Sequence, residues 1–315
     1  MDYKSLVINN RQYAQIVSDF ASGKANHAYM LTSADTNFTF NMAYMLCAVI
    51  AGTTIDKVTK NIHPDIFVFG KDGKIDVNQV NEIIETISVA PYSADKKVYC
   101  LLNIEAANET SQNKLLKSLE EPPKNVVFIL TCKNTKNILS TVLSRVKIVN
   151  IDPLSSNDIL NLLTSSGTSV AEAQIAVNCC NGNSTLAQKL TNANFVKMYN
   201  NILDMLANLN SSRDCLKYAT IFENKNVDKN EFLDTTVLLV RDIALILCGN
   251  TNLVVNKQQI DLLTKISNSY TLNATSNIIS ECLLLKEDLY YNTNSTAVLD
   301  KFLFTLAQEK VKCKK

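Results

Sequence analysis

The turn that follows the first apolar run is the place where a strand–turn–helix unit could bind a phosphate. Such a turn needs glycines that let backbone N–H groups approach the phosphate, a lysine that neutralises its charge, and a Ser or Thr that holds Mg²⁺. The segment between Thr32 and Leu46 contains no glycine and no lysine, and Phe38 and Phe40 stand where small or charged groups are required. The sequence therefore predicts a turn that cannot bind a triphosphate in the usual way.

Ser144 and Arg145 form the one positive chemical feature of the sequence. A guanidinium at a boundary between subunits can stabilise the charge that develops on a γ-phosphoryl group during its transfer. An isolated Ser-Arg dipeptide would be only a surface charge. Its role therefore depends on the elements that position it.

Short apolar runs in the first half of the chain are typical of strands, and they cover residues 28–31, 65–69, 98–102, 126–130 and 146–151. Helical patterns lie between them, including 77–87 and 111–121. Apolar runs without alternation, separated by helices, indicate a parallel sheet covered on both faces. Pro122 should end the second of these helices, because a proline disfavours helical geometry in the residue before it.

The rest of the chain contains no proline, since all five prolines lie within the first 153 residues. A long proline-free stretch rich in Leu, Ile and Asn indicates a run of helices. We expect breaks near Gly167, Gly182 and Gly249 and in the polar segments 211–214 and 224–230. The sequence thus predicts an α/β domain of about 150 residues followed by two helical parts.

Composition excludes several classes of protein. The chain has 315 residues and 34.9 kDa, enough for two or three domains, and its 46% hydrophobic and 19% charged residues exclude a largely disordered chain. The net charge of +1 gives no global basic field, so any contact with DNA would need a local patch.

The location of the protein is predicted from its cysteines and its apolar stretches. The nine cysteines are scattered and form no CxxC motif, which is typical of reduced, buried thiols in a cytosolic protein. The N-terminus lacks the pattern of a secretory signal. The apolar stretch 237–248 contains Arg241 and Asp242 and is too short to span a bilayer. We therefore expect a cytoplasmic protein with no membrane partner.

An ordered series of segments carries a family resemblance that covers nearly the whole chain. It closely resembles the delta-prime subunits of the bacterial DNA polymerase III clamp loader, which are AAA+ proteins. The most specific parts are LLKSLEEPP (115–123) and the Ser144–Arg145 pair, and the similarity weakens after residue 153. The series comprises HAYMLTS (27–33), HPDIFVF (63–69), 75–92, KVYCLLNIEAAN (97–108), 113–132 and ILSTVLSRV (138–146), then 181–190, 241–250 and 289–307.

The resemblance implies a domain organisation and a set of partners. Residues 1–153 would form an AAA+ domain with a parallel five-stranded sheet, 154–197 a small helical lid, and 198–315 an all-α collar that joins a ring of subunits. The implied partners are the gamma/tau ATPase subunits and the delta subunit. The sliding clamp and primed DNA would be contacted indirectly, through the complex.

The resemblance also implies that the nucleotide site is degenerate and that no nucleotide cofactor is bound. By this resemblance, Ser33, Thr36 and Phe38 replace the phosphate-binding glycines of the family. Thr39 replaces its lysine, and Phe40 replaces its Ser/Thr. Leu102 and Asn103 replace its acidic Mg²⁺-associated pair. The alternative is an ATP-hydrolysing AAA+ subunit with a divergent phosphate loop. A third class, an AAA+-like adaptor outside replication, also stays open.

Arg145 becomes, by the same resemblance, an arginine finger that acts in trans on the ATP of a neighbouring gamma/tau subunit, with Ser144 beside it. Val146 follows where the family usually has a cysteine. Arginine fingers contribute about 10³–10⁵ in rate. The alternative is a salt bridge that only holds the subunit interface.

Two further features have structural interpretations. The family's zinc module needs four cysteines, whereas Cys47 and His63 are the only Cys or His residues between Leu46 and Pro64, so we expect no bound metal. His27 and His63 are expected to be structural. A stripe at helical spacing near the C-terminus could be domain core or could pack against neighbouring collars, and it consists of Leu299, Phe302, Leu303 and Leu306.

Overall fold

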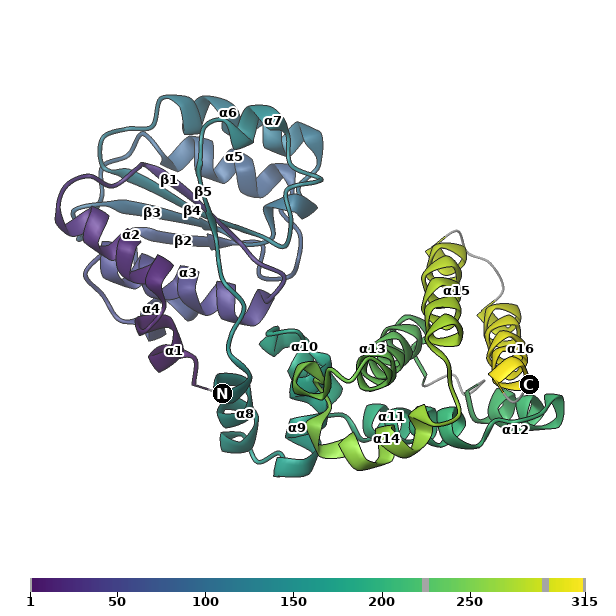
Figure 1. Cartoon of the computed structure of the whole chain (residues 1–315). Coiled ribbons are helices and arrows are strands. Elements are labelled where there is room, and N and C mark those ends of the chain that lie inside the picture. The colour runs from purple at the N-terminus through teal and green to yellow at the C-terminus, as the bar shows by residue number, and fades with distance from the viewer. Residues whose placement is uncertain (1, 223–226, 291–294, 314–315) are drawn as a thin grey trace. The chain divides into compact units, whose positions relative to one another are not determined.

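A computed structural model of the chain describes residues 2–222, 227–290 and 295–313 (Figure 1). The chain forms two compact units. The first contains residues 1–167 together with 182–186, and the second contains 168–181 together with 187–315.

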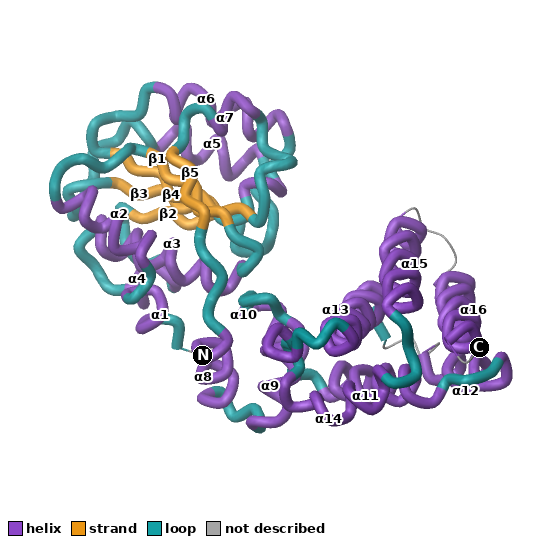
Figure 2. The backbone as a smooth tube through the Cα atoms, in the orientation of Figure 1, coloured by secondary structure: helices purple, strands orange, loops and turns teal. Residues whose placement is uncertain are grey.

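The first unit is built on a five-stranded sheet in which all neighbouring strands are parallel (Figure 2). The strand order is β2-β3-β4-β1-β5, and Met30 of β1 pairs with Leu130 of β4 and Ile148 of β5. This confirms the parallel sheet predicted from the apolar runs. The strands are β1 (Ala28–Thr32), β2 (Ile66–Phe69), β3 (Lys97–Leu101), β4 (Val126–Cys132) and β5 (Lys147–Asn150).

Helices cover both faces of this sheet. Successive strand residues point to opposite faces, so Leu31 and Cys100 join one core cluster while Met30 and Tyr99 join the other. One face packs against α1 (Lys4–Ile8), α2 (Arg11–Ala21), α3 (Thr36–Ile50) and α4 (Ile55–Thr59), and the other against α5 (Val77–Thr86), η1 (Ile104–Ala106), α6 (Glu109–Glu120) and α7 (Ser140–Leu143).

Two sequence expectations meet different outcomes in this unit. Helix α6 ends at Glu120, and Glu121 leaves helical geometry with φ −126° and ψ 63° directly before Pro122, as predicted. Strand β5 is largely exposed rather than covered on both faces, and Ile148 is 43% exposed. The reason is its place in the sheet, since β5 is an edge strand that pairs only with β1.

A buried carboxylate joins the loops before β2 and β3. Asp65 is 1% exposed and accepts hydrogen bonds from the backbone N–H groups of Tyr92, Ser93 and Ala94 at 2.6, 2.7 and 2.9 Å. Burial raises the pKa of this carboxyl, but the hydrogen bonds outweigh burial and lower its pKa from 3.8 to about 2.

Asp65→Asn should therefore destabilise the protein by about 2 kcal/mol at neutral pH, because a shift of one pKa unit corresponds to about 1.4 kcal/mol. Since the pKa is lowered on folding, this stabilisation is complete above about pH 4 and is lost as the pH falls through about 2. Urea unfolding of both proteins between pH 7 and 2 measures the difference. Asp72→Asn, at an exposed carboxylate, is the control. A difference that stays constant across this range would contradict the prediction.

The second unit is entirely helical over its described residues, which confirms the prediction from the absent prolines. The helix α8 (Ser156–Ser165) and the start of α10 (Ser184–Leu190) belong to the first unit. The other helices of the second unit are α9 (Val170–Cys179), α11 (Ala193–Asn208), α12 (Ser212–Phe222), α13 (Lys229–Leu247), α14 (Ile260–Ser267), α15 (Leu272–Tyr290) and α16 (Ser295–Cys313). Two short 3-10 turns are η2 (Thr251–Leu253) and η3 (Lys257–Gln259). Gly167, Gly182 and Gly249 lie at breaks, as expected.

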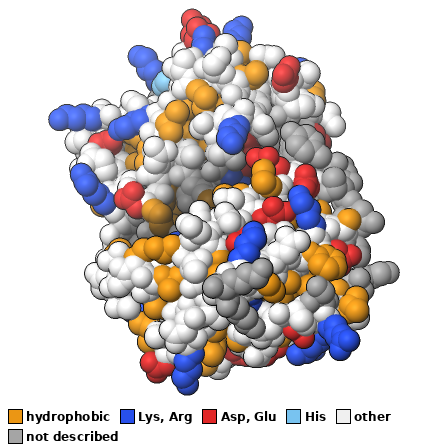
Figure 3. Space-filling model, turned by 45° about the vertical axis from the view of Figure 1, so that its right-hand side comes forward, with side chains coloured by type: hydrophobic (Ala, Val, Ile, Leu, Met, Phe, Trp, Pro, Cys, Tyr) orange, Lys and Arg blue, Asp and Glu red, His pale blue; other side chains and the backbone are white. Residues whose placement is uncertain are grey.

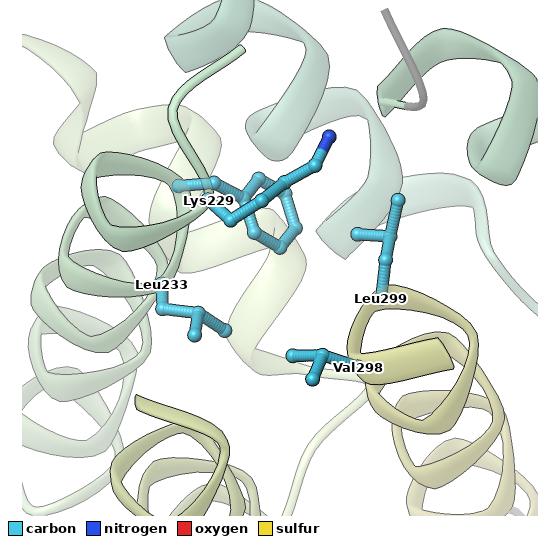
Figure 4. Close-up of a pocket in the computed structure, with 5 residues that line it drawn as sticks. Lys229, Leu233, Val298 and Leu299 are labelled. Atoms are coloured by element: carbon cyan, nitrogen blue, oxygen red, sulfur yellow. The ribbon is translucent and has the colours of Figure 1, made fainter. Parts of the chain in front are cut away.

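The C-terminal apolar stripe lies in the core of this unit. All four stripe residues are at most 2% exposed, and the rings of Phe302 and Phe232 meet edge to face with their centroids 5.5 Å apart. Figure 4 shows Leu233 of α13 facing Val298 and Leu299 of α16 across a small cavity. The stripe is therefore domain core, and the cavity reflects apolar helix packing.

The distribution of surface charge, the length of the helices and the exposure of the cysteines can be compared with what the composition predicted. Basic and acidic side chains are interspersed on the face drawn in Figure 3. No helix in residues 2–222, 227–290 and 295–313 is long and apolar enough to cross a membrane. Cys248 is exposed, although the sequence analysis predicted buried thiols, because it caps the C-terminal end of α13.

Candidate functional site

The residues of the predicted degenerate site meet at the carboxyl edge of the sheet. Parallel strands bring their carboxyl ends to one edge, so the turn after β1 lies beside the ends of β4 and β3. The Ser33 N–H donates to the Cys132 carbonyl at 3.1 Å, and the Asn103 N–H donates to the Thr131 hydroxyl at 3.0 Å. The structure therefore brings Ser33, Leu102 and Asn103 to the place where a strand–turn–helix site would bind its ligand.

Five backbone N–H groups of this turn are bonded within the protein. Besides Ser33, the Asp35 N–H donates to the Ser33 hydroxyl at 3.1 Å and the Asn37 N–H to the Thr185 hydroxyl at 2.7 Å. The Phe38 N–H donates to Asp35 Oδ1 at 3.2 Å, and the Thr39 N–H donates to the Asp35 carbonyl at 3.0 Å. A phosphate would have to displace these bonds to use the same donors.

The side chains of the turn also lie inward. Helix α3 begins at Thr36, so Phe38 and Thr39 fall in its first turn and are 1% and 2% exposed. Phe38 lies against Tyr3, with ring centroids 6.4 Å apart, and the Thr39 hydroxyl donates to the Asp35 carbonyl at 2.6 Å. Phe40 packs partly buried against the same core. At Thr39, the position expected to replace the lysine, the side chain is thus a buried hydroxyl.

The two positions of the expected acidic pair carry no charge. Leu102 is fully buried, and Asn103 adopts a left-handed conformation with φ 55° directly after it. The backbone of Gly70 approaches Leu102 closely enough that a Cβ at Gly70 would lie 2.1 Å from the Leu102 carbonyl oxygen. This edge therefore offers no carboxylate at the positions where Mg²⁺ would be expected.

Asp35 is the site residue that the sequence analysis missed. Its side chain is 3% exposed and accepts from the N–H groups of Phe38, Ser184 and Thr185 at 3.2, 2.6 and 3.2 Å. The Thr185 hydroxyl also donates to it at 2.8 Å. Preference rules for helix N-caps could have identified Asp35 as the cap of α3. Its contacts to residues about 150 positions away have no local signal.

Arg145 lies between the end of α7 and the start of β5. One guanidinium nitrogen, Nη1, donates to the Thr141 carbonyl at 2.8 Å and the Ser144 hydroxyl at 3.1 Å. The other, Nη2, forms an ion pair with Glu120 at 3.1 Å, and the Arg145 and Glu120 side chains are 28% and 57% exposed. The Nε donor is buried and has no hydrogen-bond partner among the described residues. Arg145 is thus half-buried against its own fold, with a partner that is open to solvent.

Arg145 lines a recess at the amino edge of the sheet. The recess has a volume of about 420 Å³, and its lining residues all precede strands: His27 before β1, Leu119 and Glu120 before β4, and Ser144 and Arg145 before β5. A His27 ring nitrogen, Nε2, lies 2.9 Å from the Leu119 carbonyl oxygen. At about 3.3 Å per residue, a five-residue strand separates this edge from the turn after β1 by about 16 Å. The structure therefore does not bring Arg145 to its own phosphate turn.

The candidate zinc ligands serve packing and loop structure. Cys47 is fully buried in α3, and burial raises the pKa of its thiol. The Nδ1 atom of His63 accepts from the Asp65 N–H at 3.1 Å. In the described part of the chain no group of three or more His, Cys, Asp or Glu side chains could hold a metal ion.

The fold defines a class of protein. A parallel sheet in the order β2-β3-β4-β1-β5, covered by helices on both faces and followed by a helical region, places the chain in the AAA+ fold class. Residues 8–155 match the family described as "DNA polymerase III, delta subunit". This match spans just under half of the chain, and relatives named subunit delta' support the resemblance to the clamp-loader family of DNA polymerase III that the sequence predicted.

Several relatives resemble this chain over most of its length. DNA polymerase III subunit delta' of Bacillus subtilis is 22% identical over 259 residues, which cover 80% of this chain and 78% of that protein. Subunit delta' of Buchnera aphidicola is 23% identical over 317 residues, covering 89% of this chain and 95% of that protein. Subunit gamma from the same Buchnera strain is 25% identical over 259 residues, covering 77% and 69%. A solved gamma-subunit-related protein from Thermotoga maritima gives a TM-score of 0.47 at 15% identity, covering 95% of this chain and 99% of that one.

Proposed function

We propose that this clamp-loader subunit is a non-catalytic member of the delta-prime type. It scaffolds the ring through its helical collar, residues 198–315. It supplies Arg145 in trans to the ATP site of a neighbouring gamma/tau subunit while the sliding clamp is loaded onto primed DNA. The similarity to proteins named subunit delta' and subunit gamma supports this proposal.

The observation that carries the proposal is the separation of Arg145 from the phosphate turn of its own chain. Arg145 lies at the amino edge of the sheet and the turn lies at the carboxyl edge, about 16 Å away along the strands. A guanidinium stabilises a transferring phosphoryl group only at contact distance. The phosphate that Arg145 serves therefore belongs to another subunit.

The ion pair with Glu120 does not oppose this role. Both side chains are partly exposed, and exposed ion pairs contribute about 0–1 kcal/mol. A triphosphate carries several negative charges that a guanidinium can contact with two parallel hydrogen bonds. Arg145 can therefore exchange Glu120 for a neighbour's γ-phosphate at small cost.

The contacts of the turn after β1 support the absence of catalysis in this chain. The N–H groups of Asn37 and Phe38 are bonded internally, Thr39 is buried, and the Asp35 carboxylate lies at the N-terminus of α3. The N-terminus of a helix attracts an anion, but here an internal anion already lies there and would repel a phosphate.

The isolated full chain should show no saturable, Mg²⁺-dependent binding of a fluorescent ATP analogue. The physical reason is that the turn has no lysine and that the N–H groups of Asn37 and Phe38 already donate within the protein. Fluorescence anisotropy titration measures this, with a gamma/tau subunit in the same buffer as the positive control. Saturable binding that EDTA abolishes would instead support the ATP-hydrolysing alternative.

Assembly provides the test of the scaffold role. A tagged chain expressed in its own cells should co-purify with the replication ATPase and clamp-opening subunits. Recovery of the chain without any of these subunits would favour an adaptor outside replication.

A further inference from the structure

Residues 182–186 belong to the first unit, although the residues on both sides of them belong to the second. They are held in place at three points. At Gly182, the carbonyl accepts from the Leu154 N–H at 3.0 Å, and a Cβ here would lie 2.5 Å from Pro153 Cβ. At Asn183, the side-chain amide donates to the Ala34 carbonyl at 3.0 Å.

The third point, at Ser184 and Thr185, is centred on Asp35. Asp35 Oδ2 accepts from the Ser184 N–H at 2.6 Å, and Asp35 Oδ1 accepts from the N–H and the hydroxyl of Thr185 at 3.2 and 2.8 Å. The Thr185 hydroxyl in turn accepts from the Asn37 N–H, and the Ser184 hydroxyl lies 3.1 Å from the Tyr3 hydroxyl. One buried carboxylate thus contacts the first residues of both α3 and α10.

This arrangement has the chemistry of a phosphate site in which the anion is part of the chain. Helix starts carry unbonded N–H groups and a partial positive charge, and in nucleotide-binding turns the phosphate of the ligand satisfies them. Here the Asp35 carboxylate, 3% exposed, satisfies the N–H groups of Phe38, Ser184 and Thr185.

We infer that Asp35 is a built-in substitute for a nucleotide phosphate, which holds residues 182–186 against the β1–α3 turn in the absence of any nucleotide. The inference deepens the proposed function, since it names the group that makes this part of the fold independent of ATP. Asp35 is accordingly a positioning residue that acts on the 182–186 segment.

The test is hydrogen exchange at the Ser184 and Thr185 amides of the full chain, followed by NMR or by mass spectrometry of a peptide that contains them. Asp35→Asn keeps the side-chain shape but removes the charge and half of the acceptor capacity. Because hydrogen bonds to a charged group are the stronger ones, exchange of these amides should become about tenfold faster or more. Asp35→Ala should increase it further.

The matched control is Asp76→Asn. Asp76 caps α5 in the same way, but among the described residues its carboxylate accepts only from the Gln79 N–H within its own helix start. This variant should leave exchange at Ser184 and Thr185 unchanged. If Asp35→Ala does not fold, Thr185→Val removes only the hydroxyl donor to Asp35 and should give a smaller increase at the same amides.

Nucleotide provides the second arm of the experiment. Addition of Mg-ATP to the wild-type chain should leave exchange in residues 182–186 unchanged. The inference is overturned if Asp35→Asn leaves the Ser184 and Thr185 amides as protected as in the wild type, or if their protection in the wild type requires added nucleotide. These measurements use the chain alone, so they are independent of the trans role of Arg145, which is measured in the complex.

Discussion

Replacing Arg145 with alanine in a reconstituted clamp loader should slow ATP hydrolysis at the neighbouring gamma/tau site by about 10³-fold or more. The expectation follows from the removal of a charge that, in the proposed role, contacts the γ-phosphate during transfer. Because other sites in the ring keep their own residues, total DNA-stimulated ATPase should fall only by the share of this one site. Single-turnover hydrolysis with the complex in excess separates the slow site from the others.

Three matched variants separate the finger from its local contacts. Arg145→Lys keeps the charge but loses the planar fork, so it should restore only part of the rate. Glu120→Gln removes the ion pair and leaves the guanidinium, and it should leave both stability and hydrolysis nearly unchanged, because the pair is exposed. Lys147→Ala removes a cation two residues away that pairs with Asp19. If Arg145→Ala assembles normally and hydrolyses ATP like Lys147→Ala, Arg145 is no finger; if Arg145→Ala fails to assemble, the salt-bridge alternative holds.

Replacing Asp242 with alanine should destabilise the second unit by about 3–5 kcal/mol, the usual cost of breaking a buried charged network by removing one partner. Asp242 of α13 is fully buried and accepts from the N–H groups of Val255 and Asn256 at 3.3 and 2.9 Å. It also accepts from the Asn256 side-chain amide at 2.7 Å. The Asn256 carbonyl oxygen Oδ1 in turn accepts from the Tyr199 hydroxyl at 2.9 Å. Alanine leaves these buried donors without an acceptor.

Urea unfolding followed by circular dichroism of the full chain measures this loss. Asp234→Ala is the control on the same helix, because Asp234 is 62% exposed and only pairs with Lys286 at the surface. It should change the free energy of unfolding by no more than about 1 kcal/mol. The network has no structural importance if the two variants unfold at the same urea concentration.

The sequence predicted the elements of the first unit closely. The ends of each apolar run agree with the ends of a strand to within one or two residues. The agreement is close because buried parallel strands are continuous apolar runs, which stand out from the polar segments around them. Pro122 ended α6 for a local steric reason. The edge position of β5 was not predictable, since an edge strand and a central strand can carry the same apolar run.

The sequence predicted which phosphate-binding residues the candidate site lacks, but it did not predict the contacts of Asp35 and Glu120. Missing lysine and glycine at Ser33–Thr39 can be read directly, because phosphate binding requires those residue types. The role of Asp35 could not be read, since its Ser184 and Thr185 partners are distant in sequence. The same holds for Glu120, which meets Arg145 only across the amino edge of the sheet.

Residue types and their order alone determined the alternation of strands and helices, the change to an all-helical second part, and the loss of the phosphate-binding groups. These depend on local stereochemistry and on functional groups that are either present or absent. Only the tertiary structure decided that Arg145 and the β1–α3 turn lie at opposite edges of one sheet, and that Asp35 and Asp242 are buried among distant donors. Such contacts form when the folded chain brings segments together, and a linear sequence does not state which segments will meet.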